Sequence, residues 1–89
     1  MEAFHIIVTG IVQGVGFRYY TKLEADKYQL CGTVQNLMSG DVEIYVEGKK
    51  SELLRFLDWC HVGPKTAQVD RLEYAYQEIK NVEDFRIIR

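Results

Sequence analysis

An arginine follows a glycine-containing turn near the start of the sequence. Residues 13–16 contain Gly14 and Gly16, and Arg18 falls in the first turn of the helix that we predict from residue 17. The first turn of a helix has backbone N–H groups without partners and carries a partial positive charge. Arg18 adds a planar fork of donors that fits phosphate oxygens. Since a cation is unfavourable at this end of a helix unless an anion binds, the segment predicts a phosphate cradle.

Two familiar nucleotide motifs do not fit this segment. The chain lacks the G-x-x-x-x-G-K-[ST] loop of nucleotide triphosphatases. Gly14 and Gly16 match the first glycines of a dinucleotide fingerprint, but Tyr19 stands where the third should be. The alternative to a phosphate cradle is an ordinary strand-to-helix turn followed by an exposed arginine.

The elements that must position this turn follow from the spacing of apolar residues. Period-two or continuous apolar runs predict strands at 4–12, 30–37, 42–47, 69–76 and 85–88. Period-3.6 stripes predict helices at 17–28 and 50–62, the second with Ser51 as a plausible N-cap. The order β-α-β-β-α-β plus a short terminal strand is the ferredoxin-like split βαβ plan. We therefore expect one α+β domain over residues 1–89, with an antiparallel-rich sheet and both helices on one face.

Finer features of the strands and cysteines also follow from the pattern. The uneven step between Val69 and Leu72 predicts a β-bulge. Cys31 should face the open side of the sheet and Cys60 the core, which argues against a disulfide between them. We also expect tyrosines to cover the open face of the sheet, namely Tyr45, Tyr74 and Tyr76.

Composition limits the partners and the compartment. The net charge of −2 provides no basic footprint for nucleic acid. No apolar run reaches the ~18 residues of a membrane span, and the N-terminus lacks the pattern of a secretory signal. Two cysteines without a C-x-x-C motif make a zinc site improbable. We expect a cytoplasmic protein that binds neither nucleic acid nor membrane.

Two blocks of the sequence resemble the signature of the acylphosphatase family. The first is Val8-x-Gly10-x-Val12-Gln13-Gly14-Val15-x-Phe17-Arg18. The second is Gly32-x-Val34-x-Asn36, followed by Ser39-Gly40-x-Val42-Glu43 and closed by Gly48. A weaker similarity is Gly63-Pro64 followed by Ala67-x-Val69. The chain departs from the family at Gln29, where a glycine usually ends the first helix, and at Ser39, where aspartate is common. Gln29 must therefore adopt a left-handed conformation or end the helix differently.

The resemblance implies a hydrolase that cleaves the carboxyl–phosphate bond of acyl phosphates. It places Arg18 on the phosphoryl group together with the backbone N–H groups of the loop formed by Gln13, Gly14, Val15, Gly16, Phe17 and Arg18. It gives Asn36 the task of positioning the attacking water. It implies no metal and no covalent intermediate. We also expect no cofactor, a monomer, and competition for the site by inorganic phosphate or sulfate. Without the resemblance, Asn36 would be interpreted as a turn former near a strand end.

Three alternatives use the same fold differently. RNA-recognition domains share the element order, but residues 42–47 here contain two glutamates in place of the basic and aromatic RNA-binding block. Acylphosphatase-like domains also form part of larger carbamoyl-transfer proteins. A slow or inactive relative could instead serve a protein–protein contact, although Arg18 and Asn36 are both present.

Overall fold

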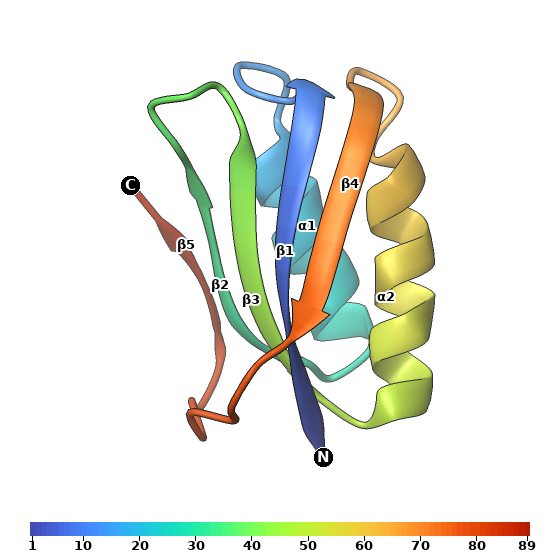
Figure 1. Ribbon diagram of the computed structural model, residues 1–89, viewed down its shortest axis with the longest axis vertical. Coiled ribbons are helices and arrows are strands. Elements are labelled where there is room, and N and C mark those ends of the chain that lie inside the picture. Colours follow the sequence, from blue (N-terminus) through green and yellow to red (C-terminus); the bar gives the residue numbers. More distant parts are fainter.

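A computed structural model describes residues 1–89 and contains the elements predicted, in the predicted order (Figure 1). Their ends differ from the predictions by at most two residues. In chain order they are β1 (Glu2–Ile11), α1 (Phe17–Lys27), β2 (Cys31–Asn36), β3 (Val42–Gly48), α2 (Lys50–Val62), β4 (Gln68–Tyr76) and β5 (Phe85–Ile88).

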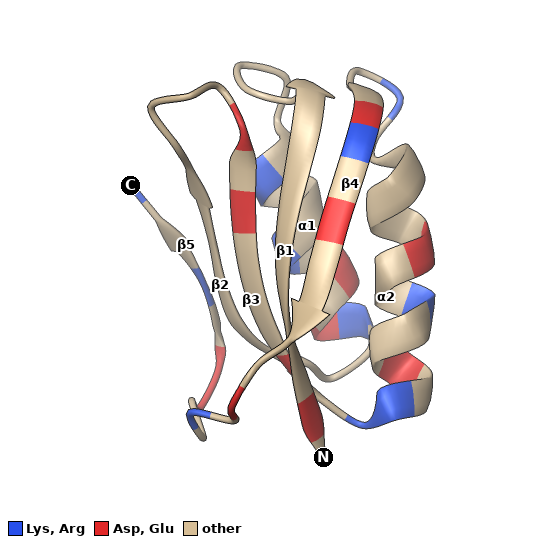
Figure 2. Cartoon of the chain, in the orientation of Figure 1, with Lys and Arg blue, Asp and Glu red and all other residues tan.

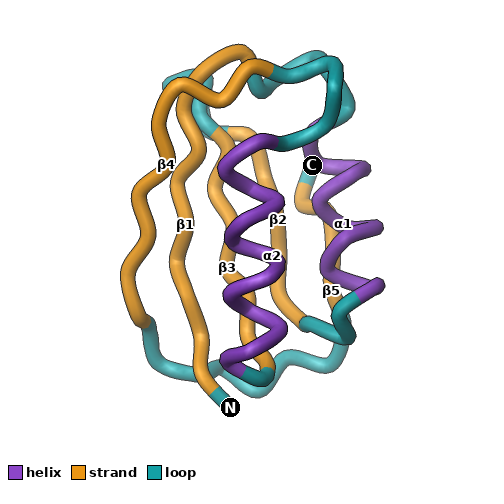
Figure 3. The backbone as a smooth tube through the Cα atoms, turned by 90° about the vertical axis from the view of Figure 1, so that its right-hand side faces the viewer, coloured by secondary structure: helices purple, strands orange, loops and turns teal.

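The strands form one sheet in the order β4-β1-β3-β2-β5. All neighbours are antiparallel except β2 and β5, which run parallel. Both helices cover the same face of this sheet, as Figure 3 shows from the helix side. The ferredoxin-like α+β architecture is thus as predicted. None of the helices combines the length and the apolar character needed to cross a membrane.

The core fills the space between the sheet and the two helices. Phe4, Ile6 and Val8 alternate along β1 and are completely buried. The helices contribute the predicted stripes, which are Phe17, Thr21 and Ala25 on α1 and Leu53, Phe56, Leu57 and Cys60 on α2. Each large apolar side chain buried in this way contributes about 1.5–3 kcal/mol. This layer fixes where the ends of β1 and β2 lie, and hence where the phosphate-binding candidates lie.

The predicted bulge lies where β1 and β4 approach the loop at residues 12–16. The pairing shifts between Thr9, opposite Arg71, and Gly10, opposite Val69, so Asp70 has no partner. Gly10 has φ of 141°, and a Cβ atom there would lie 2.1 Å from the Gln68 carbonyl oxygen. Only glycine allows the two strands to approach this closely.

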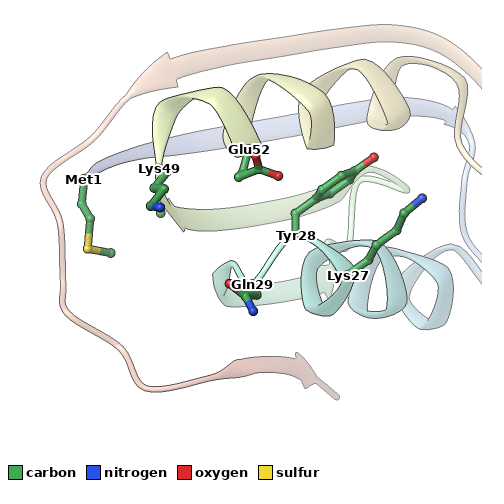
Figure 4. Close-up of a pocket in the computed structure, with 7 residues that line it drawn as sticks. Met1, Lys27, Tyr28, Gln29, Lys49 and Glu52 are labelled. Carbon is green, nitrogen blue, oxygen red and sulfur yellow. The ribbon is translucent and has the colours of Figure 1, made fainter.

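The end of α1 shows which of the two alternatives holds for Gln29, namely the left-handed conformation. Gln29 has φ of 58°. Its N–H donates to the Asp26 carbonyl at 3.1 Å, and the Leu30 N–H donates to the Ala25 carbonyl at 2.9 Å. This is the Schellman arrangement, with glutamine in the usual glycine position. Gln29 lines a surface cavity of about 490 Å³ beside the N-terminus (Figure 4).

Three expectations about individual side chains are wrong. The N-cap of α2 is Lys49, and no side chain caps the helix, so Ser51 lies inside it. Tyr74 and Tyr76 pair with Ile6 and Phe4 and therefore lie on the helix side of the sheet edge. They had to share the face of Leu72, which packs on the core, because side chains alternate along a strand.

Tyr45 does lie on the open face, but it is buried rather than exposed. The chain between β4 and β5 covers it, and the Lys80 N–H donates to its hydroxyl oxygen at 2.8 Å. Its own hydroxyl donates to the Glu47 carboxylate at 2.5 Å. Burial and this carboxylate raise the pKa of Tyr45. Glu43 and Glu73 both pair with Ile7 and so share the open face with the buried Tyr45; Figure 2 marks acidic residues on both of their strands. This face therefore suits RNA poorly.

The cysteines lie on opposite faces of the sheet, as predicted. Cys31 pairs with Glu47 on the open side, whereas Cys60 is completely buried among core residues of α2. Both thiols are free. Burial raises the pKa of both, and that of Cys60 strongly, so neither thiol favours the reactive thiolate form.

Candidate active site

The connections β1–α1, β2–β3 and α2–β4 gather at one end of the molecule, the top in Figure 1. Side-chain hydrogen bonds hold the first of them between the other two. Gln13 Nε2 donates to the carbonyl oxygens of Leu37, at 2.7 Å, and Asp41, at 2.9 Å. On the other side, Thr66 Oγ1 donates to the Val15 carbonyl oxygen at 2.6 Å. The glycine-containing loop is therefore fixed relative to the end of β2.

The loop presents backbone N–H groups that have no partner in the chain. Gly14 and Gly16 have φ of 75° and 78°, a left-handed conformation that glycine adopts without strain. Gly16 is the N-cap of α1 and has no side chain to cap it. None of the N–H groups of residues 13–19 donates a hydrogen bond within the protein. Such a run of free donors at a helix N-terminus has the geometry that suits an anion.

A cavity of about 180 Å³ opens over this loop. Four of the six predicted loop residues line it, namely Gly14, Gly16, Phe17 and Arg18, and Asn36 lines it from the end of β2. Gln13 and Val15 do not line it, because one anchors the loop to the β2–β3 turn and the other packs against the core. The fold thus brings Arg18 and Asn36 into the same cavity.

Arg18 is half-buried at the edge of this cavity. Its only contact with an acceptor is a long one of 3.5 Å, from Nη1 to the Ile88 carbonyl oxygen. No carboxylate pairs with it, and the first turn of α1 contains no acidic residue. The guanidinium therefore keeps its donors available for an anionic ligand.

Asn36 holds an unusual polar atom. Its Oδ1 is buried without a hydrogen-bond partner, and no other buried side-chain nitrogen or oxygen of the chain shares this property. Leaving a buried acceptor unsatisfied costs about 1–3 kcal/mol. An orphan acceptor that lines a cavity is suited to a ligand or water that brings its own donor.

Sequence reasoning missed several residues of this cavity. Val12 and Tyr19 adjoin the predicted loop residues, whereas Ile87 and Arg89 come from the other end of the chain. The parallel pairing of β5 with β2 brings them here, with Ile87 opposite Val34. No local pattern in the sequence could have shown this placement. No cluster of three or more His, Cys, Asp or Glu side chains is arranged to hold a metal ion.

Comparison with known proteins agrees with this geometry. Residues 4–87 match the family model described as acylphosphatase. The acylphosphatase of Geobacillus kaustophilus is 44% identical over 89 residues, which are 99% of this chain and 95% of that protein. The acylphosphatase of Moorella thermoacetica is 45% identical over 83 residues, covering 93% and 89% of the two chains. The crystal structure of acylphosphatase from Bacillus subtilis matches with a TM-score of 0.97 at 37% identity over 100% of both chains.

These similarities define a ferredoxin-like α+β enzyme of the hydrolase class. The chain belongs to the acylphosphatase family, whose members hydrolyse acyl phosphates.

Proposed function

We propose that the cavity formed by the 13–18 loop, Arg18 and Asn36 is the site where water attacks the phosphoryl group of an acyl phosphate. The observation that carries the proposal is the shared cavity itself. It combines a loop of unpaired N–H groups, an arginine without a carboxylate partner and a buried amide oxygen without a donor. Each part lacks the partner that a phosphoryl group with its attacking water supplies.

Arg18 and the loop bind the phosphoryl oxygens. Phosphoryl transfer passes through a loose transition state in which negative charge spreads over the equatorial oxygens. N–H donors fixed in advance around those oxygens stabilise this charge without having to reorganise. The Arg18 fork adds a full positive charge and a directional pair of donors. Catalysis here is therefore mainly positioning and electrostatic stabilisation.

Asn36 holds the water in line with the bond that breaks. Its Oδ1 accepts a hydrogen bond from the water, which directs a lone pair of the water oxygen toward phosphorus. An amide is too weak a base to remove the proton, so its contribution is orientation. No Ser, Cys, His, Asp or Glu lines the cavity, and water is therefore the nucleophile in this proposal.

The leaving group requires no help from an acid. A carboxylic acid that resembles a glutamate side chain has a pKa near ~4.3, so the carboxylate departs unprotonated at neutral pH. Arg18 and the N–H groups supply the positive potential that the reaction needs. The proposed reaction accordingly proceeds without a metal ion or a covalent intermediate.

The test is hydrolysis of acetyl phosphate, followed by phosphate release at neutral pH with a chelator present. The wild type is compared with Arg18→Gln, Asn36→Ala and the neighbouring control Gln35→Ala. We expect the wild type and the control to turn over, and both cavity variants to lose about 10²–10³-fold in kcat. Circular dichroism verifies that all variants fold. Loss of wild-type turnover on chelation would contradict the metal-free mechanism, and full activity of either cavity variant would contradict its role.

The same arrangement supports further proposals about partners and setting. Inorganic phosphate and sulfate should compete with substrate, because both present oxygens to the same N–H groups. The loop, Arg18 and Asn36 fill every role in the proposed reaction without a second copy, so we propose that the protein acts as a monomer and a single domain. Its unpaired cysteines on opposite faces suit the reducing cytoplasm.

A further inference from the structure

A second cavity, of about 270 Å³, lies between the two helices. Its walls are mostly apolar or aromatic and come from α1, α2 and the loop that follows α2. The lining residues are Tyr20, Leu23, Glu24, Trp59, Pro64, Lys65 and Thr66. Tyr20 is 43% exposed and Leu23 is 48% exposed, so α1 presents large apolar groups to this opening. The volume is close to the ~300 Å³ at which small-ligand pockets begin.

This second cavity adjoins the phosphate loop. The Tyr20 ring lies beside Gly16, where an added Cβ atom would be 3.5 Å from ring atom Cε2. Thr66, on the opposite rim, donates its hydroxyl hydrogen bond to the Val15 carbonyl. Tyr19 lines the first cavity and Tyr20 the second, and their ring centroids are 5.2 Å apart in an edge-on arrangement. The tyrosine pair therefore forms the boundary between the two cavities.

We propose that the second cavity receives the acyl part of substrates whose acyl group is aromatic or apolar, with Tyr20 and Leu23 as specificity-determining residues. The proposal rests on the proposed function, because it takes the phosphoryl end to be held by Arg18 and the loop. In this proposal the acyl end leaves the cradle past the Tyr19–Tyr20 edge, because that pair separates the first cavity from the second. An aromatic acyl group there meets tyrosine and Trp59 rings, which favour edge-on or offset contacts. An acetyl group offers only one methyl carbon to these apolar walls, whereas a benzoyl group offers a whole ring.

The experiment compares kcat/KM for benzoyl phosphate with kcat/KM for acetyl phosphate in the full chain. The variants are Tyr20→Ala and, one turn farther from the loop, Leu23→Ala. Tyr74→Ala is the matched control, because Tyr74 is similarly exposed at 49% but lies on β4, the edge strand of the sheet, and lines neither cavity. We expect the benzoyl-to-acetyl ratio to fall about tenfold in both α1 variants, as for the loss of one apolar contact in a substrate pocket. The control should keep the wild-type ratio.

Binding provides a second readout that does not need turnover. Trp59 is the only tryptophan and lines the second cavity. Benzylphosphonate should change its fluorescence, methylphosphonate should change it less, and Leu23→Ala should weaken the benzylphosphonate response. Ratios that match the wild type in both α1 variants, with measurable turnover, would overturn the inference. If the wild type turned over neither benzoyl phosphate nor acetyl phosphate, the proposed function would be contradicted. In that case the fluorescence measurement tests the inference by itself, and an equal Trp59 response to the two phosphonates would overturn it.

Discussion

Replacement of Asn36 by alanine should separate activity from stability. The Asn36 Oδ1 is buried without a donor, so the folded protein bears a cost of about 1–3 kcal/mol that the unfolded, hydrated chain does not. Alanine removes that acceptor and loses only a few packing contacts. We therefore expect the free energy of unfolding to stay unchanged or to rise by up to ~1 kcal/mol. For a chain of this size, that corresponds to at most about 4–8 °C in Tm.

Activity should move in the opposite direction. If Asn36 orients the attacking water, its removal should lower kcat by about 10²–10³, or ~2.7–4 kcal/mol in the activation free energy. Urea unfolding measures stability, and release of phosphate from acetyl phosphate measures kcat. A loss of ~2 kcal/mol in stability on Asn36→Ala would refute the reasoning, because it would mean that the amide makes a stabilising contact in the folded protein.

Gln35→Ala is the natural comparison for this experiment. Gln35 is adjacent in sequence but points to the open face, where its Nε2 donates to Glu43 Oε1 at 2.7 Å. Loss of that hydrogen bond should lower the free energy of unfolding by about 1 kcal/mol and leave kcat unchanged. Asn36→Ala should thus lower kcat without lowering stability, whereas Gln35→Ala should lower stability without lowering kcat.

Other consequences follow from the same contacts. Arg18→Lys keeps the positive charge but loses the planar fork of donors. Because a hydrogen bond to a charged group contributes about 1.5–3 kcal/mol, kcat/KM should fall at least ~10-fold and the inhibition constant of inorganic phosphate should rise. Gln29→Gly should raise the free energy of unfolding, measured in urea, by about 0.5–1 kcal/mol, because it relieves the left-handed strain at φ of 58°; a decrease would contradict that account. Hydrogen bonds from His5, at 2.8 Å, and Gln35 lower the pKa of Glu43. The stability that Glu43 contributes is therefore present above its ordinary pKa of 4.5 and lost as the pH falls through the lowered value. Glu43→Gln should flatten the acid side of the stability–pH curve, and an unchanged curve would contradict this coupling.

Periodic apolar patterns made most of the architecture predictable. Apolar spacing fixes which face of an element is buried, and in a chain this short the buried faces allow few arrangements. The bulge at Asp70 was also predicted, because the uneven apolar spacing is a local departure from a regular pattern. For Gln29 the sequence left two alternatives, and the structure has the left-handed one. The tyrosines of β4 were placed wrongly although the same reasoning applies to them. The bulge lies before Leu72, so alternation from this core-packed residue puts Tyr74 and Tyr76 on the helix face.

By itself, the sequence determined the elements, their order and the local chemistry of the glycine-containing loop with Arg18. These depend on neighbours within a few residues, where spacing and backbone preferences act directly. The family resemblance had assigned Asn36 to the site of that loop, but only the tertiary structure showed that it lines the same cavity with an acceptor left unpaired. Only the tertiary structure added Ile87 and Arg89. Pairings between distant strands place those residues, and such pairings depend on how the whole sheet packs against the helices.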